Sequence, residues 1–427
     1  MSEEIIVARE SENLSGTVQI SGAKNSALKL VAASLLGQGK TTILNVPLIS
    51  DISIMCTVMN RLGATIEREG HALHIDASSI TSCKTPYNLV SKMRASISVL
   101  GPLVARMGKA QVAMPGGCQI GARKIDMHLL GMQQLGVHFE MDHGYLMATT
   151  PNGLHGGDIV LQFPSVGATE NTMMTAVVAK GTTTIDNAAR EPEIEDLANM
   201  LNAMGAHVEG AGTACIHIEG VPLSSMHPCE HVTVGDRIEA GTFLVGGALM
   251  GGPVTVKGVN PDHLRMALVK LRTMGCDVTT TEDSITVQRI QPLRAVDIQT
   301  LPYPGFPTDL QAQFMLLAAL AEGNSIITEN VFENRFMFAA EMQRMGADIF
   351  IDDHHAIVRG IKRLQGAEVE ATDLRAGAAI VLAGLAAEGM TSVHNIKHID
   401  RGYEDYVGKL RKLGANIERT TFEETTY

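Results

Sequence analysis

The feature that most restricts how this chain can fold is an internal repeat with a period near 70 residues. A short motif, in which Leu or Met precedes Gly and a small residue follows, occurs at Leu62-Gly63-Ala64, Leu135-Gly136-Val137, Met204-Gly205-Ala206, Met274-Gly275-Cys276, Met345-Gly346-Ala347 and Leu413-Gly414-Ala415. The glycines are 73, 69, 70, 71 and 68 residues apart. Because glycine is favoured just beyond the last turn of a helix, each motif predicts a helix end. The period is too long for a solenoid, and each copy is large enough to supply part of a core.

Each copy combines helices with strands. After the motif the residues alternate, as in Ala64-Thr65-Ile66-Glu67-Arg68, which is typical of a strand. Before it, helices rich in small residues are predicted at 27–36, 167–178, 241–249 and 376–387, and β-branched strands at 40–44, 182–185 and 325–327. The sequence therefore predicts an α/β fold made of α+β repeats. Six copies divide most simply into two domains of three.

The first copy lacks a complete preceding strand unless residues 5–20 supply one from the N-terminus. We therefore expect the chain to cross between the two domains more than once. No Pro-rich linker or low-complexity stretch marks a boundary, and the weakly patterned stretch Ser224–His231 is the best candidate for one.

Composition excludes several classes of function. The 427 residues carry a formal net charge of −12, which argues against nucleic acid or an anionic membrane as the main partner. The first ten residues contain acids and no apolar core, so no signal peptide is expected, and the apolar stretch 378–387 is too short to span a membrane. The six cysteines form no CxxC pair and are expected to be reduced thiols of a cytoplasmic protein.

Charged residues gather where strands are predicted to pass into helices. These junctions read Ser21-Gly22-Ala23-Lys24-Asn25, Lys92-Met93-Arg94-Ala95-Ser96, Pro164-Ser165-Val166-Gly167-Ala168-Thr169, Gly235-Asp236-Arg237-Ile238-Glu239, Phe306-Pro307-Thr308-Asp309 and Thr372-Asp373-Leu374-Arg375. Helix capping accounts for Ser165, Thr308 and Thr372. It does not account for Lys24, Arg94 and Arg375, because a cation opposes the dipole at a helix N-terminus. A bound anion would make these three cations favourable, since free N–H groups at a helix start attract anions.

A second notable stretch is Pro115-Gly116-Gly117-Cys118-Gln119-Ile120-Gly121-Ala122-Arg123-Lys124. Its glycines allow the backbone to approach a ligand, and two cations follow the cysteine. A thiol in such surroundings has a lowered pKa and serves as a nucleophile or an acid. The alternative is a structural cysteine, and the residues alone leave both interpretations open.

Three other motifs do not carry chemistry. Gly39-Lys40-Thr41 resembles the end of a P-loop, but Ser34 stands where the first glycine is needed. Gly210-Ala211-Gly212-Thr213 lies between two predicted strands and is expected to be a hairpin turn rather than a dinucleotide site. Asp352-Asp353-His354-His355 lies at a similar turn, where a solvated hairpin tip is favoured over a metal site.

Over nearly its whole length the chain resembles the UDP-N-acetylglucosamine enolpyruvyl transferases. The matching segments are Ser21–Asn25, Met93–Ser96, Pro115–Arg123, Ser165–Thr169, Asp236–Phe243, Phe306–Asp309, Phe332–Phe336, Thr372–Arg375 and His398–Tyr403. The resemblance implies an inside-out α/β barrel of two domains, one of residues 23–234 and one of residues 1–22 plus 235–427. It also implies phosphoenolpyruvate and UDP-N-acetylglucosamine as substrates, with no cofactor and no metal.

The resemblance also implies a role for each residue that matches a motif. Cys118 would act as an acid toward phosphoenolpyruvate and add to it as a thioether, and Asp309 would take the proton of the sugar 3-hydroxyl. Lys24, Arg123 and Arg401 would hold the phosphate and carboxylate of phosphoenolpyruvate. The remaining substrate contacts implied are Asn25, Arg94, Lys124, Ile125, Asp126, Met127, Ser165, Val166, Gly167, Val331, Arg335, Asp373 and Arg375. The phosphate and carboxylate of phosphoenolpyruvate and the diphosphate of the nucleotide-sugar need several guanidinium groups, which bind such oxyanions through paired hydrogen bonds.

The chain departs from the family at two positions, and two alternative functions remain. Lys124 stands where members often have Pro, and Phe163 where some have Lys; both would flank the nucleotide. One alternative is a shikimate-pathway enolpyruvyl transferase, which shares the repeat but lacks the Cys118 loop. The other is a non-catalytic relative that binds nucleotide-sugar, which the presence of Lys24, Cys118 and Asp309 argues against.

Overall fold

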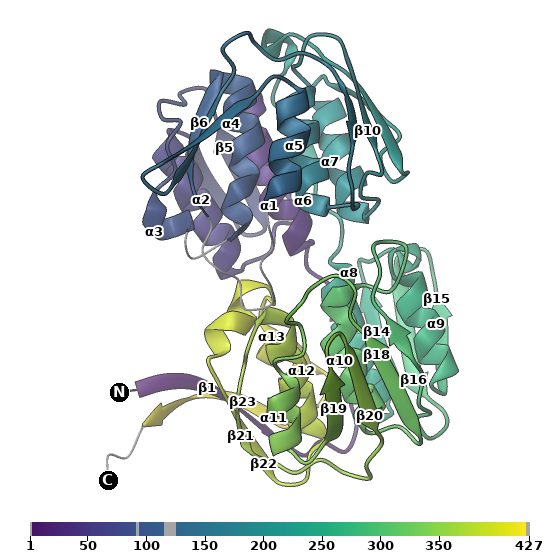
Figure 1. Cartoon of the computed structure of the whole chain (residues 1–427). Coiled ribbons are helices and arrows are strands. Elements are labelled where there is room, and N and C mark those ends of the chain that lie inside the picture. Colours follow the sequence, from purple (N-terminus) through teal and green to yellow (C-terminus); the bar gives the residue numbers. More distant parts are fainter. Residues whose placement is uncertain (1, 91–93, 115–124, 424–427) are drawn as a thin grey trace. The chain divides into compact units, whose positions relative to one another are not determined.

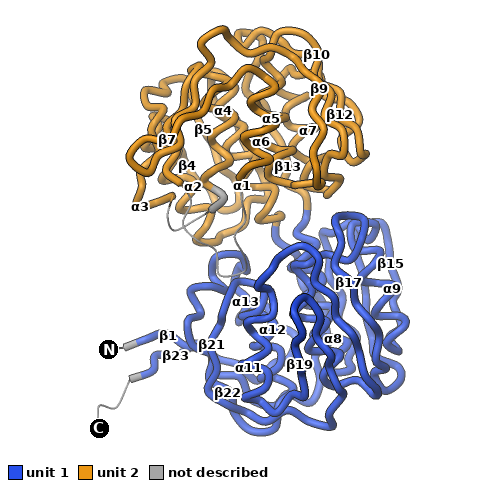
Figure 2. The backbone as a smooth tube through the Cα atoms, viewed as in Figure 1, with its two compact units in different colours: residues 1–21, 119–121, 235–427 blue, residues 22–118, 122–234 orange. Residues whose placement is uncertain are grey.

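The computed structural model describes residues 2–90, 94–114 and 125–423. These form two compact units (Figure 2): one contains the described residues of 22–234, and the other those of 1–21 and 235–427. Both are mixed α/β structures with three sheets each. The boundary at Val234–Gly235 lies beyond the weakly patterned Ser224–His231, because the strand β13 (Glu230–Val232) pairs in parallel with β3 (Lys40–Leu44).

The first unit contains three sheets (Figure 1). Their strand orders are β13-β3-β5-β4, β6-β8-β7 and β11-β12-β10-β9. The strands not yet given are β4 (Thr65–Glu69), β5 (Ala72–Asp76), β6 (Lys109–Ala113), β7 (His138–Asp142), β8 (Tyr145–Thr149), β9 (Asp158–Val160), β10 (Thr182–Asp186), β11 (His207–Glu209) and β12 (Cys215–Glu219). The helices are α1 (Lys24–Ala33), α2 (Ser50–Leu62), α3 (Tyr87–Val90), α4 (Leu100–Met107), α5 (Asp126–Gln134), α6 (Val166–Ala176) and α7 (Pro192–Ala203), with 3₁₀ turns η1 (Ser34–Leu36), η2 (Arg94–Val99) and η3 (Leu223–Ser225).

The second unit repeats this plan. Its sheets have the orders β15-β16-β14-β2, β17-β18-β20-β19 and β21-β22-β1-β23. Their strands are β1 (Ser2–Arg9), β2 (Gly16–Gln19), β14 (Val254–Lys257), β15 (Cys276–Thr280), β16 (Ser284–Arg289), β17 (Ile298–Gln299), β18 (Asn324–Thr328), β19 (Asp348–Asp352), β20 (His355–Arg359), β21 (Glu368–Glu370), β22 (Met390–His394) and β23 (Ile417–Glu423). The helices are α8 (Arg237–Met250), α9 (Arg265–Thr273), α10 (Gln311–Ala319), α11 (Ala339–Arg344), α12 (Leu374–Ala386) and α13 (Tyr406–Lys412), with η4 (Pro261–Leu264), η5 (Thr308–Leu310) and η6 (Ile396–Arg401).

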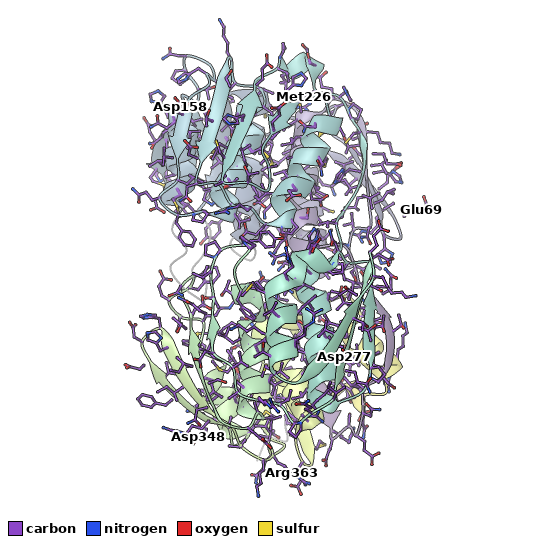
Figure 3. All side chains as sticks on the ribbon, turned by 90° about the vertical axis from the view of Figure 1, so that its right-hand side faces the viewer. Glu69, Asp158, Met226, Asp277, Asp348 and Arg363 are labelled. Atoms are coloured by element: carbon purple, nitrogen blue, oxygen red, sulfur yellow. The ribbon has the colours of Figure 1, made fainter. Side chains whose placement is uncertain are left out.

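Three apolar helices form the centre of the second unit. Every residue of α8 and of α10 is buried, and α12 is buried from Arg375 to Leu385. A helix that is apolar on all sides needs protein on all sides, and these three contact one another as well as the sheets. In contrast, charged side chains such as Asp277 and Asp348 stand on the exposed faces of the sheets (Figure 3). No helix among the described residues is both long and apolar enough to cross a bilayer.

The predicted helix ends are confirmed. The motif glycines at 63, 136, 205, 275, 346 and 414 all have positive φ, between 89° and 110°. This left-handed conformation costs glycine little, whereas a side chain there would be strained. The two predicted hairpin turns are confirmed as well, since β11 pairs antiparallel with β12, and β19 with β20.

The N-terminal strands β1 and β2 pair with strands of the second unit. Residues 5–20 do not complete the first repeat, which instead receives its parallel strand from β13. β1 pairs with β22 and β23 of the last repeat, and β2 pairs in parallel with β14 of the fourth. The chain therefore begins in the unit that it later completes, passes into the other unit at residues 21–22, and returns at residues 234–235.

Candidate active site

Lys24 is the first residue of α1 and forms a buried ion pair. Its Nζ lies 2.9 Å from Oδ2 of Asp51, and their side chains are only 9% and 2% exposed. Asp51 lies in the first turn of α2. The carboxylate offsets the unfavourable position of a cation at a helix N-terminus. Nothing in the sequence marks Asp51 as this partner, because an acid in a first helical turn is common and Lys24 lies 27 residues away.

Lys29 connects the start of the same helix to a buried glutamate. Its Nζ donates to the carbonyl oxygen of Asn25 (3.2 Å) and to Oε1 of Glu170 (3.1 Å). Glu170, on α6, is 1% exposed. Burial raises the pKa of its carboxyl to about 7, and the positive charge of Lys29 opposes that rise.

The raised pKa predicts how Glu170 couples stability to pH. The folded protein binds a proton at Glu170 that the unfolded chain has lost above its ordinary pKa of 4.5. The contribution of this group to stability is therefore complete below pH 4.5 and is lost as the pH rises through about 7. We expect the unfolding free energy of the wild type, relative to Glu170→Gln, to fall by roughly 3 kcal/mol between about pH 5 and pH 8.

Denaturant titrations at several pH values measure this difference. Glu69→Gln is the matched control, because Glu69 is exposed on β4 at the edge of the molecule (Figure 3). Its difference from wild type should stay constant over the same range. A difference between wild type and Glu170→Gln that does not change with pH would show that Glu170 stays ionised in the folded protein.

The start of α6 is a capped helix N-terminus, as predicted for Ser165. Its Oγ accepts from the backbone N of Ala168 at 3.4 Å. Val166 and Gly167 form the first turn, and a Cβ at Gly167 would lie 2.8 Å from Cε1 of His128. His128 belongs to α5, whose N-terminus contains Asp126 and Met127 and is preceded by the buried Ile125. Because α5 packs on α6, these six predicted substrate contacts lie on two neighbouring helix starts.

Asp309 lies between two arginines in the other unit. Its Oδ1 is 3.0 Å from Nη2 of Arg335, and its Oδ2 is 3.4 Å from Nε of Arg375. The side chains of Arg335 and Arg375 are only 5% and 3% exposed, while that of Asp309 is 24% exposed. Burial acts to lower the pKa of Arg375, but nearby Tyr403 and Asp309 raise it above its ordinary value. The guanidinium of Arg375 also lies 5.2 Å from the ring centre of Tyr403.

The two threonine caps expected from the sequence are wrong. Asp373 caps α12, because its Oδ1 accepts from the backbone N of Arg375 (2.8 Å) and of Ala376 (3.1 Å). The hydroxyl of Thr372 is buried and makes no hydrogen bond to the part of the chain that the structure describes. Thr308 donates its hydroxyl to Oε2 of Glu329 at 2.9 Å. At α12 the reason is that an aspartate accepts from N–H groups more strongly than a neutral hydroxyl does. At η5 the hydroxyl of Thr308 is taken up by the carboxylate of Glu329, and no side chain caps the turn.

Two further predicted residues are placed near these groups. The backbone N of Val331 donates to Oε1 of Glu329 at 2.8 Å. Arg401 is half-buried at the end of η6. The pKa of His398 is lowered first by the burial of His398 and next by the positive charge of Arg401. Cys118, Arg123 and Lys124 lie outside the described residues, as does the side chain of Arg94. Among the residues that the structure describes, no group of three or more His, Cys, Asp or Glu is arranged to hold a metal ion.

Comparisons with known proteins identify the family. The family model of EPSP synthase (3-phosphoshikimate 1-carboxyvinyltransferase) matches residues 8–410. A UDP-N-acetylglucosamine 1-carboxyvinyltransferase of Desulfatibacillum aliphaticivorans is 50% identical over 414 residues, which cover 97% of this chain and 99% of the relative. The enzyme of that name from Mycobacterium tuberculosis is 51% identical over 419 residues, covering 98% of this chain and 99% of the relative.

Solved structures agree with this result. The enolpyruvyl transferase NikO from Streptomyces tendae superposes with a TM-score of 0.90 at 30% identity, covering 99% of this chain and 100% of that chain. EPSP synthase from Acinetobacter baumannii shares the fold, with a TM-score of 0.75 at 17% identity, and covers 98% of this chain and all of that one. These matches extend over nearly the whole length of the chain. The chain therefore belongs to the enolpyruvyl transferase family, and within it to the UDP-N-acetylglucosamine 1-carboxyvinyltransferases.

Proposed function

We propose that this protein transfers the enolpyruvyl group of phosphoenolpyruvate to the 3-hydroxyl of UDP-N-acetylglucosamine and releases phosphate. The chain is about half identical to UDP-N-acetylglucosamine 1-carboxyvinyltransferases. The observation that carries the proposal is the placement of Asp309. Its carboxylate lies against two buried guanidinium groups, at the start of a buried helix. The reaction is the first committed step of peptidoglycan synthesis and would take place in the cytoplasm.

The proposed chemistry is an addition followed by an elimination. Asp309 takes the proton of the sugar 3-hydroxyl while the oxygen of that hydroxyl forms a bond to C2 of phosphoenolpyruvate. Cys118 gives a proton to C3. In the elimination the thiolate left on Cys118 takes a proton back from C3, and the C2–O bond to phosphate breaks, which restores the double bond. Phosphate leaves with the proton that Asp309 had taken from the sugar. Lys24, Arg123 and Arg401 would hold the phosphate and carboxylate, and their charges would stabilise the intermediate.

The other predicted residues would bind substrate. Asn25, Arg94, Arg335, Arg375, Asp373 and Val331 would contact the substrates directly. The two adjoining helix starts at Ile125–Met127 and Ser165–Gly167, with Lys124 before them, would hold the nucleotide part, because free N–H groups there attract a diphosphate. We further propose that each unit is a domain with an inside-out α/β barrel, an arrangement supported by the mutual contacts of the buried α8, α10 and α12.

A phosphate-release assay tests the function and its specificity. Release should depend on both phosphoenolpyruvate and UDP-N-acetylglucosamine, and shikimate 3-phosphate should be used at least about 10³-fold less efficiently, because a site built for one set of polar groups rejects a substrate that lacks them. Shikimate 3-phosphate is the relevant alternative, since the matching family model is described by that activity. Efficient turnover of shikimate 3-phosphate, or no turnover with either acceptor, would contradict the proposal.

A further inference from the structure

Glu329 is a buried carboxylate that joins two separate loops. It follows β18 directly and is 3% exposed. Its Oε1 accepts from the Thr300 hydroxyl (2.9 Å) and from the backbone N of Val331 (2.8 Å) and Phe332 (3.1 Å). Its Oε2 accepts from the Thr308 hydroxyl at 2.9 Å. Both oxygens are therefore occupied by donors from the chain itself, which is how a buried carboxylate is stabilised.

The position of Glu329 is a departure from the internal repeat. In four other copies a residue with positive φ directly follows the corresponding strand: Asn45 after β3, Asn187 after β10, Gly258 after β14 and Asn395 after β22. Glu329 follows β18 but is not in that conformation. The fifth copy has thus replaced a turn residue with a buried acid, so the requirement of the repeated fold does not explain Glu329.

The two loops that Glu329 joins carry the groups of the proposed reaction. Thr308 directly precedes Asp309, and Val331 and Phe332 lead to Arg335. Arg335 in turn donates to Asp309 at 3.0 Å. The contacts therefore close a ring, from Glu329 to Thr308, along the chain to Asp309, across to Arg335, and back along the chain to Phe332.

We propose that Glu329 is a positioning residue, which fixes Asp309 and Arg335 relative to each other without touching substrate. This inference rests on the proposed function. A base must lie within hydrogen-bond reach of the hydroxyl that it deprotonates, and an error of about 1 Å in its placement costs about 10²-fold in rate. The side chain of Asp309 is 24% exposed and can meet a substrate, whereas Glu329 is buried and can act only through the residues around it.

Two substitutions separate the position of the acid from its charge. Glu329→Ala removes all four acceptor contacts and should lower kcat about 10²-fold. The KM for UDP-N-acetylglucosamine should rise by a smaller factor, up to about tenfold, because Val331 and Arg335 are also proposed substrate contacts. Glu329→Gln should stay within about fivefold of wild type, because its amide oxygen can serve the three donors at Oε1 and its NH₂ can donate to the rotated hydroxyl of Thr308. Glu322→Ala, an exposed glutamate just before β18, is the matched control and should leave kcat unchanged.

A double-mutant cycle tests whether the effect passes through Thr308. Thr308→Val alone should lower kcat about tenfold, and adding it to Glu329→Ala should cause almost no further loss, because the contact is already gone. Rates are normalised to the folded fraction. If Glu329→Ala keeps kcat within about threefold of wild type, or if the two losses multiply, the inference is overturned. If Glu329→Ala does not fold, Thr308→Val decides, and an unchanged kcat overturns it.

The wild-type assay separates this inference from the proposed function. If wild type releases no phosphate with both substrates present, the proposed function fails and the role of Glu329 fails with it. If wild type is active and folded Glu329→Ala is equally active, the function stands and only the role of Glu329 is rejected.

Discussion

Asp309→Asn is expected to lower kcat by about 10³-fold, because general base catalysis contributes roughly 10²–10⁴ and an amide cannot take the proton. The substitution keeps the size and one hydrogen-bond acceptor for Arg335, so binding of UDP-N-acetylglucosamine should change little. Steady-state kinetics with calorimetry of nucleotide-sugar binding measures both quantities. A kcat of Asp309→Asn within about threefold of wild type would remove Asp309 from the proton transfer.

The same substitution has a cost in stability that must be measured alongside. Arg335 and Arg375 are buried, and the neutral amide removes the negative charge that lies against both of them. Breaking a buried ion pair from one side costs up to about 3–5 kcal/mol, so the kinetics belong well below the melting temperature of the variant. Asp277→Asn is the matched control, because Asp277 is exposed on β15 (Figure 3) and its replacement should leave both kcat and stability unchanged.

Cys118→Ser is expected to lose most turnover, about 10²-fold or more, because a hydroxyl is far too weak an acid at neutral pH. Cys118→Asp should keep measurable activity, since a carboxyl group can give a proton. The resemblance to the UDP-N-acetylglucosamine enolpyruvyl transferases implies that fosfomycin, an epoxide that mimics phosphoenolpyruvate, would alkylate Cys118. Wild type should therefore be inactivated in proportion to labelling, with UDP-N-acetylglucosamine promoting the reaction, and Cys118→Asp should escape.

Four of the five other cysteines have surroundings that should make labelling selective. Burial raises the thiol pKa of Cys56 and Cys229, and raises that of Cys276 to about 11. The pKa of Cys215 is raised by a hydrogen bond to Asp186. Because the thiolate is the reactive form, these thiols are expected to react slowly at neutral pH. Mass spectrometry of the treated protein measures the distribution, and an adduct spread over several cysteines would count against a special role for Cys118.

Much of the fold could be predicted because its signals are local. The six glycines mark helix ends through a conformation that glycine alone adopts at little cost, and strand alternation depends only on neighbouring residues. The predicted strand at 40–44 has the bounds of β3, and the predicted helices match α1 with η1, α6, α8 and α12 to within a few residues, except that α8 begins earlier. Lys24 and Arg375 were notable in the sequence for a local reason too, since cations are unusual at helix starts.

Only the tertiary structure decided what depends on partners distant in the sequence. The sheet that β1 joins, the ion pair of Lys24 with Asp51, and the ring through Glu329, Thr308, Asp309 and Arg335 all depend on such partners. The physical reason is that a strand, an acid or a threonine has many possible partners, and the residues next to it in the sequence do not distinguish among them. The choice among them is made when the buried helices and sheets pack, because each buried charge must then find its counter-charge and each buried donor its acceptor.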